Sequence, residues 1–351
     1  MARVIIFPIE PIETRYTGEW YRNIPNQLIK AGADEVLQID GEVDSAVTTE
    51  GAFLNFSATN VYKSTQLVRF VRDVLPTLKN DDRILFTDAW NPCAIQVRYM
   101  LDLMGIEARM IGMWHAGSYD RFDFLGRGVS PDWSYQFERS LYHAYDLNVF
   151  ATEFHFRMFQ NVLNDGQRGK IPVRKTVIAG WPMEYLQGIG DPSVPKENIV
   201  LFPHRLSEEK NPQVFDALAE RLGHKYQFIK CQDQKLTKDQ YHALLRRAKV
   251  VFSASEQETL GIGVYEGLLC GAAPYMPDHL SYSEIWSDHP KLLYFKKHVL
   301  GTEGDLDILA NEIEVLMDND EYRENIVKEA LHYEYVHSFF DGHNLYQAIL
   351  R

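Results

Sequence analysis

Two glutamates, Glu258 and Glu266, stand eight positions apart in the stretch 253–284. Gly261 and Gly263 lie between them, where the pattern predicts that a loop gives way to a helix. Because glycine has no side chain, the first N–H groups of that helix, which lack partners within the helix, can meet an anion. The two carboxylates can accept hydrogen bonds from neutral hydroxyls beside it. These groups suit a nucleotide sugar, which carries a diphosphate, a ribose and a hexose.

The stretch resembles the Glu-x7-Glu motif of the retaining glycosyltransferases of the GT-B fold, of the family 4 type. The residues that carry the resemblance are Ser255, Glu258, Gly261, Glu266, Gly271 and Pro274. Thr259 and Leu260 stand where glycine and phenylalanine are usual, which bears on the shape of the sugar pocket. The resemblance implies an α/β protein of two Rossmann-like, doubly wound parallel-sheet domains that face a cleft. The second domain would bind the donor and the first the acceptor.

The resemblance also implies a donor site in the second half. Arg205 and Lys210, in the loop after the predicted strand 199–202, would neutralise the diphosphate and offset the charge that grows as the glycosidic bond breaks. Glu266 would bind the ribose and Glu258 the hexose hydroxyls. The expected donor-binding residues are Arg205, Lys210, Glu258, Thr259, Leu260, Gly261 and Glu266. Without the resemblance, Arg205 and Lys210 are two surface cations at a helix start.

His115 follows the predicted strand 108–113, where the resembling family has a histidine that faces the donor sugar. With Glu258, Arg205 and Lys210 it completes the expected catalytic set, and a structural histidine is the equal alternative. The implied reaction retains the anomeric configuration by front-face attack, with the leaving phosphate as base. UDP-glucose is the expected co-substrate, and neither a metal nor another cofactor is expected.

The composition is that of an ordinary globular protein, and 351 residues are enough for two domains. Cys93, Cys231 and Cys270 are far apart, which indicates reduced cysteines in an intracellular, cytoplasmic protein. The beginning, MARVIIFPIE, is a core strand rather than a signal peptide, and no apolar run approaches the roughly 20 residues of a membrane span. We therefore expect a soluble protein with no membrane partner. The sequence does not predict the oligomeric state.

The formal charge of −13 argues against generic adhesion to nucleic acid, which depends mostly on phosphate neutralisation. The acidic excess is smaller in the first half, so that half suits an anionic macromolecule better. One span, 166–175, has cations and no acid; its charged residues are Arg168, Lys170, Arg174 and Lys175. This span is either a nucleic-acid contact or a solvated loop.

Strand patterns alternate with helix patterns along the chain, which predicts parallel, doubly wound sheets. Expected strands are 4–7, 36–39, 84–87, 108–113, 146–152, one within 174–185, 199–202, 226–230 and 250–253. Expected helices are 20–31, 64–78, 93–104, 152–163, 212–222, 238–248, 305–317 and 321–340, and 41–62 is expected to be a loop or edge hairpin. The expected domains are 1–185 and 198–335, joined by a Gly- and Pro-rich linker, 186–197, with a final helix in 336–351 that returns to the first domain.

The expected acceptor site lies in the first half. The long loop after the first strand comes at the carboxyl end of that strand, where open α/β sheets bind ligands. A later segment, 114–139, interleaves aromatic residues with arginines, which suits stacking on bases or sugars. The expected acceptor-binding residues are Arg15, Tyr16, Trp20, Tyr119 and Arg121. Acidic residues cancel much of the charge, so a packed aromatic subdomain is the alternative.

The sequences of two loops indicate which class of acceptor the protein uses. PHRLSEEKNP and PDHLSYSEIW are similar to the tRNA-queuosine mannosyltransferases and to small virus-encoded glycosyltransferases that act on hydroxymethylated pyrimidines in DNA. The likeness is carried by Asp278, Leu280, Ser281, Tyr282 and Glu284. Both groups modify a hydroxyl on an altered base, and on duplex such an enzyme must extrude its target. We favour DNA over tRNA; the alternatives are a glycan acceptor and a non-catalytic module that binds nucleotide sugars.

Overall fold

The structure is a computed structural model that describes residues 3–13, 15–43, 55–164, 171–294 and 302–351. These residues form two compact units. Unit 1 comprises Met1–Pro182 and Asp341–Arg351, and unit 2 comprises Met183–Phe340. Each unit is an α/β domain built on a parallel sheet, which confirms the predicted fold class.

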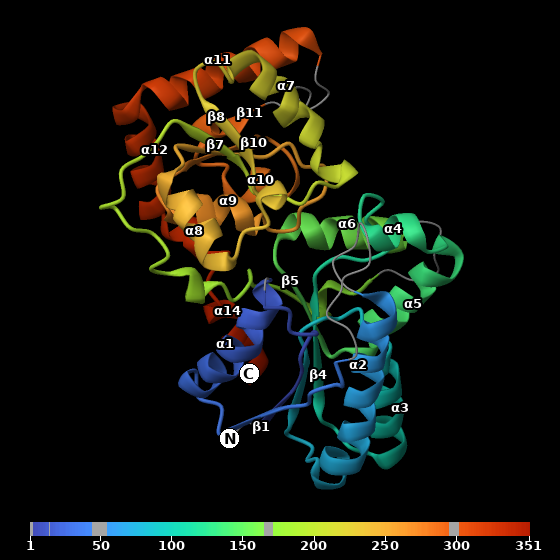
Figure 1. The fold of residues 1–351 in the computed structure, drawn as a ribbon. Helices are drawn as coiled ribbons and strands as arrows, with labels where there is room; N and C mark the ends of the chain where they lie inside the picture. The colour runs from blue at the N-terminus through green and yellow to red at the C-terminus, as the bar shows by residue number, and fades with distance from the viewer. Residues whose placement is uncertain (1–2, 14, 44–54, 165–170, 295–301) are drawn as a thin grey trace. The chain divides into compact units, whose positions relative to one another are not determined.

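Unit 1 has a six-stranded sheet in the order β2-β1-β3-β4-β5-β6, and every neighbouring pair is parallel. Its strands are β1 Arg3–Phe7, β2 Glu35–Gln38, β3 Arg83–Phe86, β4 Arg109–Trp114, β5 Leu147–Phe150 and β6 Thr176–Ile178. Its α-helices are α1 Tyr16–Lys30, α2 Phe56–Arg69, α3 Cys93–Met104, α4 Phe124–Gly128, α5 Pro131–Ala144, α6 Glu153–Asn164 and α14 His343–Leu350. Figure 1 shows α1 on one side of the strands and α2 with α3 on the other.

The strand order of unit 1 fixes where loops can form a site. The chain passes from β1 to β2 in one direction and then returns to β3 on the other side of β1. The loops after β1 and β3 therefore diverge at the carboxyl edge of the sheet, which is the topological switch point where open α/β sheets bind ligands. The strands themselves are buried apolar runs, as a sheet covered on both faces requires.

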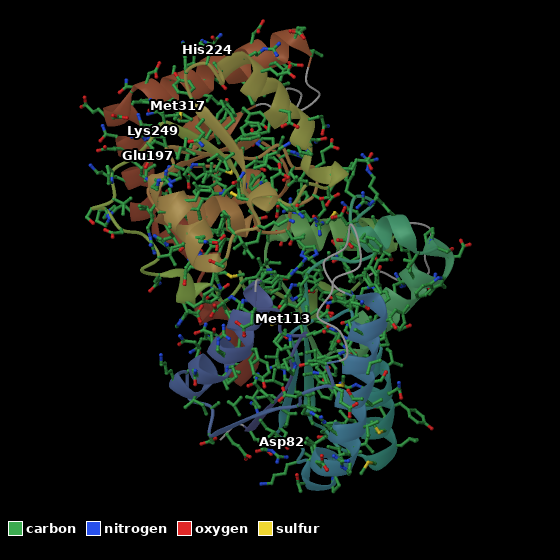
Figure 2. All side chains as sticks on the ribbon, viewed as in Figure 1. Asp82, Met113, Glu197, His224, Lys249 and Met317 are labelled. Atoms are coloured by element: carbon green, nitrogen blue, oxygen red, sulfur yellow. The ribbon has the colours of Figure 1, made fainter. Side chains whose placement is uncertain are left out.

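Unit 2 has a five-stranded parallel sheet in the order β11-β10-β9-β7-β8. Its strands are β7 Ile199–Phe202, β8 Gln227–Lys230, β9 Val250–Phe252, β10 Ala273–Pro277 and β11 Leu293–Tyr294. Its α-helices are α7 Pro212–Leu222, α8 Lys238–Arg247, α9 Ile262–Leu269, α10 Leu280–Ile285, α11 Glu303–Asp318, α12 Asp320–His332 and α13 Glu334–Ser338. Side chains fill the space between helices and sheet, where Lys249 donates to the carbonyl of Met317 at 2.9 Å (Figure 2).

Two predicted loops were too long. Helix α1 begins at Tyr16 rather than Trp20, because the short loop before it folds back tightly: Thr17 Oγ1 accepts from the N–H of Ile12 at 3.1 Å. Pro25 lies inside α1 and removes one helical donor, but the carbonyl of Tyr21 accepts from Gln38 Nε2 instead, at 3.0 Å. Helix α2 begins at Phe56 within the expected loop 41–62, of which residues 44–54 lie outside the described residues.

The last predicted helix, 321–340, is divided. Helix α12 ends at His332, because Tyr333 adopts an extended backbone with ψ 107°, and the short α13 follows. The expected linker 186–197 lies within unit 2, where Lys196 Nζ donates to the carbonyl of Cys270 at 2.7 Å. Helix α14 belongs to unit 1, where Arg83 donates to its last carbonyls at 3.1 Å and so complements the negative end of the helix.

Candidate functional site

The switch point of unit 2 brings together the two loops that the sequence singled out. The chain leaves β7 toward β8 on one side and later returns to β9 on the other side of β7. The loop after β7 carries Arg205 and Lys210, and the loop after β9 carries Glu258. Because β7 and β9 are paired neighbours, with Leu201 opposite Val251, the two loops start side by side. Hydrogen bonds between them hold this arrangement: Glu256 N–H donates to the carbonyl of Glu209 at 2.8 Å.

Lys210 and Glu258 form a buried ion pair at this point. The Nζ atom of Lys210 lies 2.7 Å from Glu258 Oε1 and also donates to the carbonyl of Gln257. Burial by itself raises the pKa of Glu258, but the positive charge of Lys210 and its hydrogen bond to the carboxylate lower it, and the pKa lies below its ordinary value. Glu258 is therefore ionised at neutral pH, and its second oxygen stays available to accept from a hydroxyl.

Arg205 is also paired with a carboxylate. Its Nη2 atom lies 2.7 Å from Glu209 Oε1, and Ser207 Oγ donates to the same oxygen at 2.6 Å. The Arg205 side chain is 26% exposed, whereas that of Glu209 is 1% exposed, so the guanidinium is the accessible member of the pair. Asn211, at φ 49°, turns the chain into α7 and donates to the carbonyl of Ala254 at 3.0 Å. Two cations thus lie on one strand-end loop, each already neutralised by a carboxylate.

The turn into α9 has the geometry that the glycine pattern predicts. Gly261 is the N-cap of α9 with φ 86°, a left-handed conformation that suits glycine. A Cβ atom on Gly261 would lie 2.6 Å from the Tyr282 ring, so α10 closes over this turn. Of the expected donor residues beside it, Leu260 is buried and Thr259 is partly buried. The turn into α9 therefore requires a residue without a side chain, both for its left-handed backbone and for the close approach of Tyr282.

Glu266 lies one turn into α9 and has its own partners on α8. Tyr241 OH donates to Glu266 Oε2 at 3.1 Å, and His242 Nε2 lies 3.4 Å from Glu266 Oε1. Because Tyr241 and His242 orient both oxygens of Glu266, its carboxylate is fixed rather than free to rotate. Of the expected donor residues, Lys210 and Glu258 thus contact each other directly, whereas Glu266 is held by the side chains of α8.

Sequence reasoning missed the other polar residues of this site. His204, Gln257, Tyr241 and His242 were not selected, although His204 stands directly before Arg205. The imidazole of His204 has its Nδ1 atom 3.6 Å from Glu258 Oε1, and burial lowers its pKa to about 4, so it is neutral at pH 7. A single histidine in a loop belongs to no periodic pattern. The position of His204 next to Arg205 was therefore the one feature of the sequence that could have indicated its place in this site.

His115 lies in unit 1, directly after β4, and both of its ring nitrogens are engaged. Its Nε2 lies 2.6 Å from the carbonyl of Thr87, which can only accept, so Nδ1 accepts from Tyr16 OH at 3.0 Å. The ring stacks on Trp181 with centroids 5.2 Å apart and lies against Trp20 at 5.1 Å. Burial lowers the pKa of His115, which keeps the imidazole neutral.

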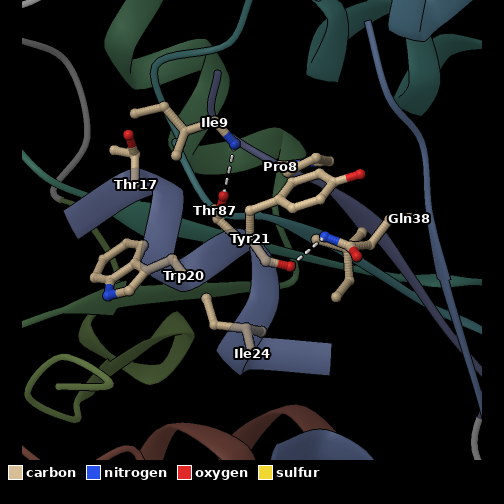
Figure 3. Close-up of a pocket in the computed structure, with 9 residues that line it drawn as sticks. Pro8, Ile9, Thr17, Trp20, Tyr21, Ile24, Gln38 and Thr87 are labelled. Carbon is tan, nitrogen blue, oxygen red and sulfur yellow. Dashed lines mark hydrogen bonds between the residues drawn. The ribbon is translucent and has the colours of Figure 1, made fainter. Parts of the chain in front are cut away.

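The expected acceptor residues fall into two groups in unit 1. Tyr16 and Trp20 pack around His115, and Trp20 is buried beside a small, mostly apolar recess along α1 (Figure 3). Tyr119 is buried too, with its OH 2.6 Å from His155 Nε2. Arg15 precedes α1 and is partly exposed, and Arg121 is exposed with its guanidinium 4.5 Å from the centroid of the Phe122 ring. Trp20 and Tyr119 therefore stabilise unit 1 in this conformation, and Arg121 is the exposed member of the set.

Charged residues that the sequence did not select lie at the switch point of unit 1. Asp88, in the loop after β3, pairs with Lys63 at 2.8 Å, and Lys63 also donates to the carbonyl of Trp90 at 2.8 Å. Glu10, in the loop after β1, is buried, and burial raises its pKa. A half-exposed Trp133 on α5 lies against Trp90 with centroids 6.4 Å apart. This edge of unit 1 therefore combines carboxylates with an accessible aromatic surface.

The basic span is only partly described. Arg168 and Lys170 lie outside the described residues. Lys175 donates from Nζ to the carbonyls of His143 and Tyr145, at 3.1 Å each. Its positive charge therefore lies at the carboxyl end of α5, where it complements the helix dipole. Among the residues that the structure describes, there is no group of three or more His, Cys, Asp or Glu side chains that could hold a metal ion. In the same ranges, no helix is long and apolar enough to cross a membrane.

Comparison with known proteins gives matches at the level of structure. No protein-family model matches the chain, and no curated protein sequence does. Sucrose-phosphate synthase from Thermosynechococcus elongatus matches with a TM-score of 0.66 and 12% identity over 100% of this chain and 96% of that chain. A UDP-forming α,α-trehalose-phosphate synthase from Burkholderia xenovorans, in complex with glucose-6-phosphate, matches with a TM-score of 0.63 and 12% identity over 99% and 98% of the two chains.

A third match is the G117R mutant of TarM from S. aureus, in complex with fondaparinux, α-GlcNAc-glycerol and UDP. Its TM-score is 0.56 and its identity 14%, and the match covers 82% of this chain and 57% of the TarM chain. The chain has the GT-B fold. The matches to the two synthases span nearly the whole of both chains, so the fold extends over both units.

Proposed function

We propose that this protein is a retaining glycosyltransferase that transfers a sugar from a nucleotide diphosphate sugar, with UDP-glucose as the expected donor. The observation that carries the proposal is the switch point of unit 2, where the strand-end loops carry Arg205, Lys210 and Glu258 and lead into the glycine turn of α9. Cations, a helix N-terminus and a fixed carboxylate at one strand edge match a diphosphate joined to a polyhydroxyl sugar. The GT-B fold of the sugar-transferring synthases supports this reading.

Each residue then has a role in the transfer. Arg205 and Lys210 bind the diphosphate and offset the charge that it gains as the bond between the anomeric carbon and the phosphate oxygen breaks. Glu258 accepts hydrogen bonds from the sugar hydroxyls, and Glu266, held by Tyr241, accepts from the ribose. The acceptor oxygen forms the new bond on the face that the phosphate leaves, and its proton passes to the departing phosphate oxygen. The anomeric configuration is thereby retained.

Donor binding must rearrange the ion pairs at the switch point of unit 2. Lys210 is neutralised by Glu258, and Arg205 by Glu209. A diphosphate competes with these carboxylates for the same cations, and when Lys210 turns to the phosphate, Glu258 is released to bind the sugar. His115 is proposed to orient the sugar or the acceptor, for which one of its two hydrogen bonds, to Tyr16 or to Thr87, has to open.

For the acceptor we propose a hydroxyl on a modified base in DNA, of the 5-hydroxymethylpyrimidine type. The support is the resemblance of the loops around Arg205 and Tyr282 to base-modifying glycosyltransferases, together with the accessible Trp133, on which a base can stack. A sugar phosphate is the second candidate, because the trehalose-phosphate synthase that matches nearly the whole chain is in complex with glucose-6-phosphate. A tRNA base and a glycan are further acceptors that one assay can compare.

The first experiment tests the donor site. Glu258→Gln keeps the volume of the side chain and removes its charge, and Glu258→Ala removes it entirely and leaves Lys210 buried without its partner. We expect kcat/KM to fall at least about 100-fold in both variants, which is about 2.7 kcal/mol of transition-state stabilisation. Glu208→Gln is the matched control, because Glu208 is an exposed carboxylate in the same loop as Lys210. Unchanged turnover in Glu258→Gln would contradict the assignment.

The second experiment identifies the acceptor. The protein is incubated with nucleotide sugars and, separately, with DNA containing 5-hydroxymethylcytosine or 5-hydroxymethyluracil, with tRNA, and with glucose-6-phosphate. Mass analysis of the digested nucleosides and of the small molecules shows where a sugar is added. A hexose on the modified pyrimidine supports the DNA proposal, and a hexose on glucose-6-phosphate supports the second candidate. Donor binding without transfer or hydrolysis would favour a non-catalytic module.

A further inference from the structure

His204 is a buried histidine inside the proposed donor site, and its second ring nitrogen has no hydrogen-bond partner among the described residues. It follows β7 by two residues, is 8% exposed, and lies edge-on to the Phe202 ring with centroids 5.2 Å apart. Its Nδ1 atom lies 3.6 Å from Glu258 Oε1. Its Nε2 atom is buried and makes no hydrogen bond within the described part of the chain. A buried polar atom without a partner is costly unless a ligand or a rearrangement supplies one.

The charges around His204 balance only while the donor is absent. Within the described part of unit 2, the charged groups that act on it are Glu258, Lys210 and Arg205. Lys210 is paired with Glu258, and Arg205 with Glu209, so two positive charges face two negative ones. A nucleotide diphosphate sugar adds two negative charges to this set. The site then has an excess of negative charge that a buried location cannot hold without compensation.

We propose that His204 takes up a proton when a nucleotide diphosphate sugar binds, and that the imidazolium acts as a third cation of the donor site. Its Nδ1–H donates to Glu258, which Lys210 has left, and its Nε2–H donates to an oxygen of the donor. The proton comes from solvent and returns to solvent when the nucleoside diphosphate leaves, so the transfer reaction itself is unchanged. The inference rests on the proposed function, because it requires that Lys210 and Arg205 bind the diphosphate.

The groups that now lower the pKa of His204 explain why donor binding makes it take up a proton. Burial is the main reason that the pKa of His204 is lowered to about 4; Glu258 raises it, and Lys210 and Arg205 lower it. A bound diphosphate offsets the two cations and adds negative charge of its own, so each change raises the pKa of the imidazole. At pH 6.5 a pKa restored to the ordinary value of about 6.5 corresponds to about half a proton gained per donor bound.

The test is calorimetric titration of the full chain with UDP-glucose at pH 6.5, in Pipes and in imidazole buffer. UDP-glucose is used rather than UDP, because its diphosphate diester has no group that titrates near neutral pH. The dependence of the binding enthalpy on the ionisation enthalpy of the buffer gives the number of protons exchanged. We expect an uptake of at least about half a proton for the wild type, from the pKa change described above.

Two variants decide which group takes the proton. In His204→Gln we expect no buffer dependence and a dissociation constant for UDP-glucose that is roughly 10- to 100-fold higher, as for one lost charged hydrogen bond. His224→Gln is the matched control, because His224 is an exposed histidine of unit 2 (Figure 2). We expect it to bind and to take up protons like the wild type. If His204→Gln does not fold, the dissociation constant of the wild type is measured against pH. It must rise by up to about tenfold per pH unit between the pKa of the free protein, about 4, and the pKa in the complex, and level off above the latter.

The outcomes separate this inference from the proposed function. Binding of UDP-glucose without proton uptake, or a flat pH dependence of its affinity, would overturn the role of His204 and leave the donor site intact. Uptake that persists in His204→Gln would also overturn it, because another group would then take the proton. If neither UDP-glucose nor ADP-glucose nor GDP-mannose binds, the proposed function fails and the inference fails with it.

Discussion

Glu138 is a fully buried carboxyl in unit 1. Its environment allows us to predict how the free energy of unfolding depends on pH. It lies on α5, where Oε1 accepts from Trp90 Nε1 at 2.8 Å and from the N–H of Ser118 at 2.6 Å. Its other oxygen, Oε2, has no hydrogen-bond partner among the described residues. Burial raises the pKa of Glu138 from 4.5 to about 7, although the hydrogen bonds from Trp90 and Ser118 act in the opposite direction. The folded protein therefore holds a proton here that the unfolded chain releases.

The sign and size of the effect follow from this difference. A raised pKa contributes stability that is fully present below pH 4.5 and is lost as the pH rises through about 7. The difference of roughly 2.5 units corresponds to about 3 kcal/mol of unfolding free energy. Glu138→Gln keeps an oxygen acceptor for Trp90 and Ser118 and cannot titrate. We therefore expect the free energy of unfolding of Glu138→Gln, relative to the wild type, to increase by about 3 kcal/mol between pH 4.5 and pH 8.

Urea unfolding at a series of pH values measures this difference. Of the 6 tryptophans, Trp286 alone lies in unit 2, so fluorescence reports mainly on unit 1, where Glu138 lies. Unpaired amide groups in the variant shift the absolute difference by a constant, and the slope with pH is therefore the test. Glu153→Gln is the matched control, because the Glu153 side chain is 44% exposed and pairs with Arg157 on a helix surface. A pH-independent difference, or one that falls with pH, would refute the reasoning.

Two further predictions concern the donor site. Gly261→Ala places a side chain at φ 86° and a Cβ atom 2.6 Å from the Tyr282 ring, so we expect roughly 2 kcal/mol lower unfolding free energy and loss of donor binding. Gly304→Ala, where nothing lies within 4 Å, is the control for thermal melts, and equal melting temperatures for both variants would contradict this. Tyr241→Phe removes the donor at 3.1 Å from Glu266 Oε2, and we expect the dissociation constant for UDP-glucose to rise roughly tenfold with little change in kcat. A lower kcat at unchanged affinity would place Glu266 in the chemical step instead.

Sequence patterns correctly predicted the helices and strands whose ends depend on residues close by in the sequence. Helix α3 runs from Cys93 to Met104 and ends at Gly105 with φ 66°, as the apolar spacing and the terminal glycine indicated. Strand β7 and helix α7 also have the predicted bounds. The errors arose where distant residues decide a boundary. Helix α1 starts early because its N-terminus packs on the loop before it, and a carbonyl freed by Pro25 is satisfied by Gln38 of β2.

The site shows the same division. The sequence by itself determined which groups with useful chemistry exist and that a glycine turn opens α9, because a cation, a carboxylate and a left-handed backbone are properties of single residues and their neighbours. The tertiary structure alone decided that Lys210 pairs with Glu258, 48 positions away, and that His204 lies against the same oxygen. Those contacts depend on β7 and β9 being adjacent in the sheet, and the burial that lowers the pKa of His204 depends on the packing of both loops. Strand pairing and desolvation are properties of the whole fold, which no local pattern encodes.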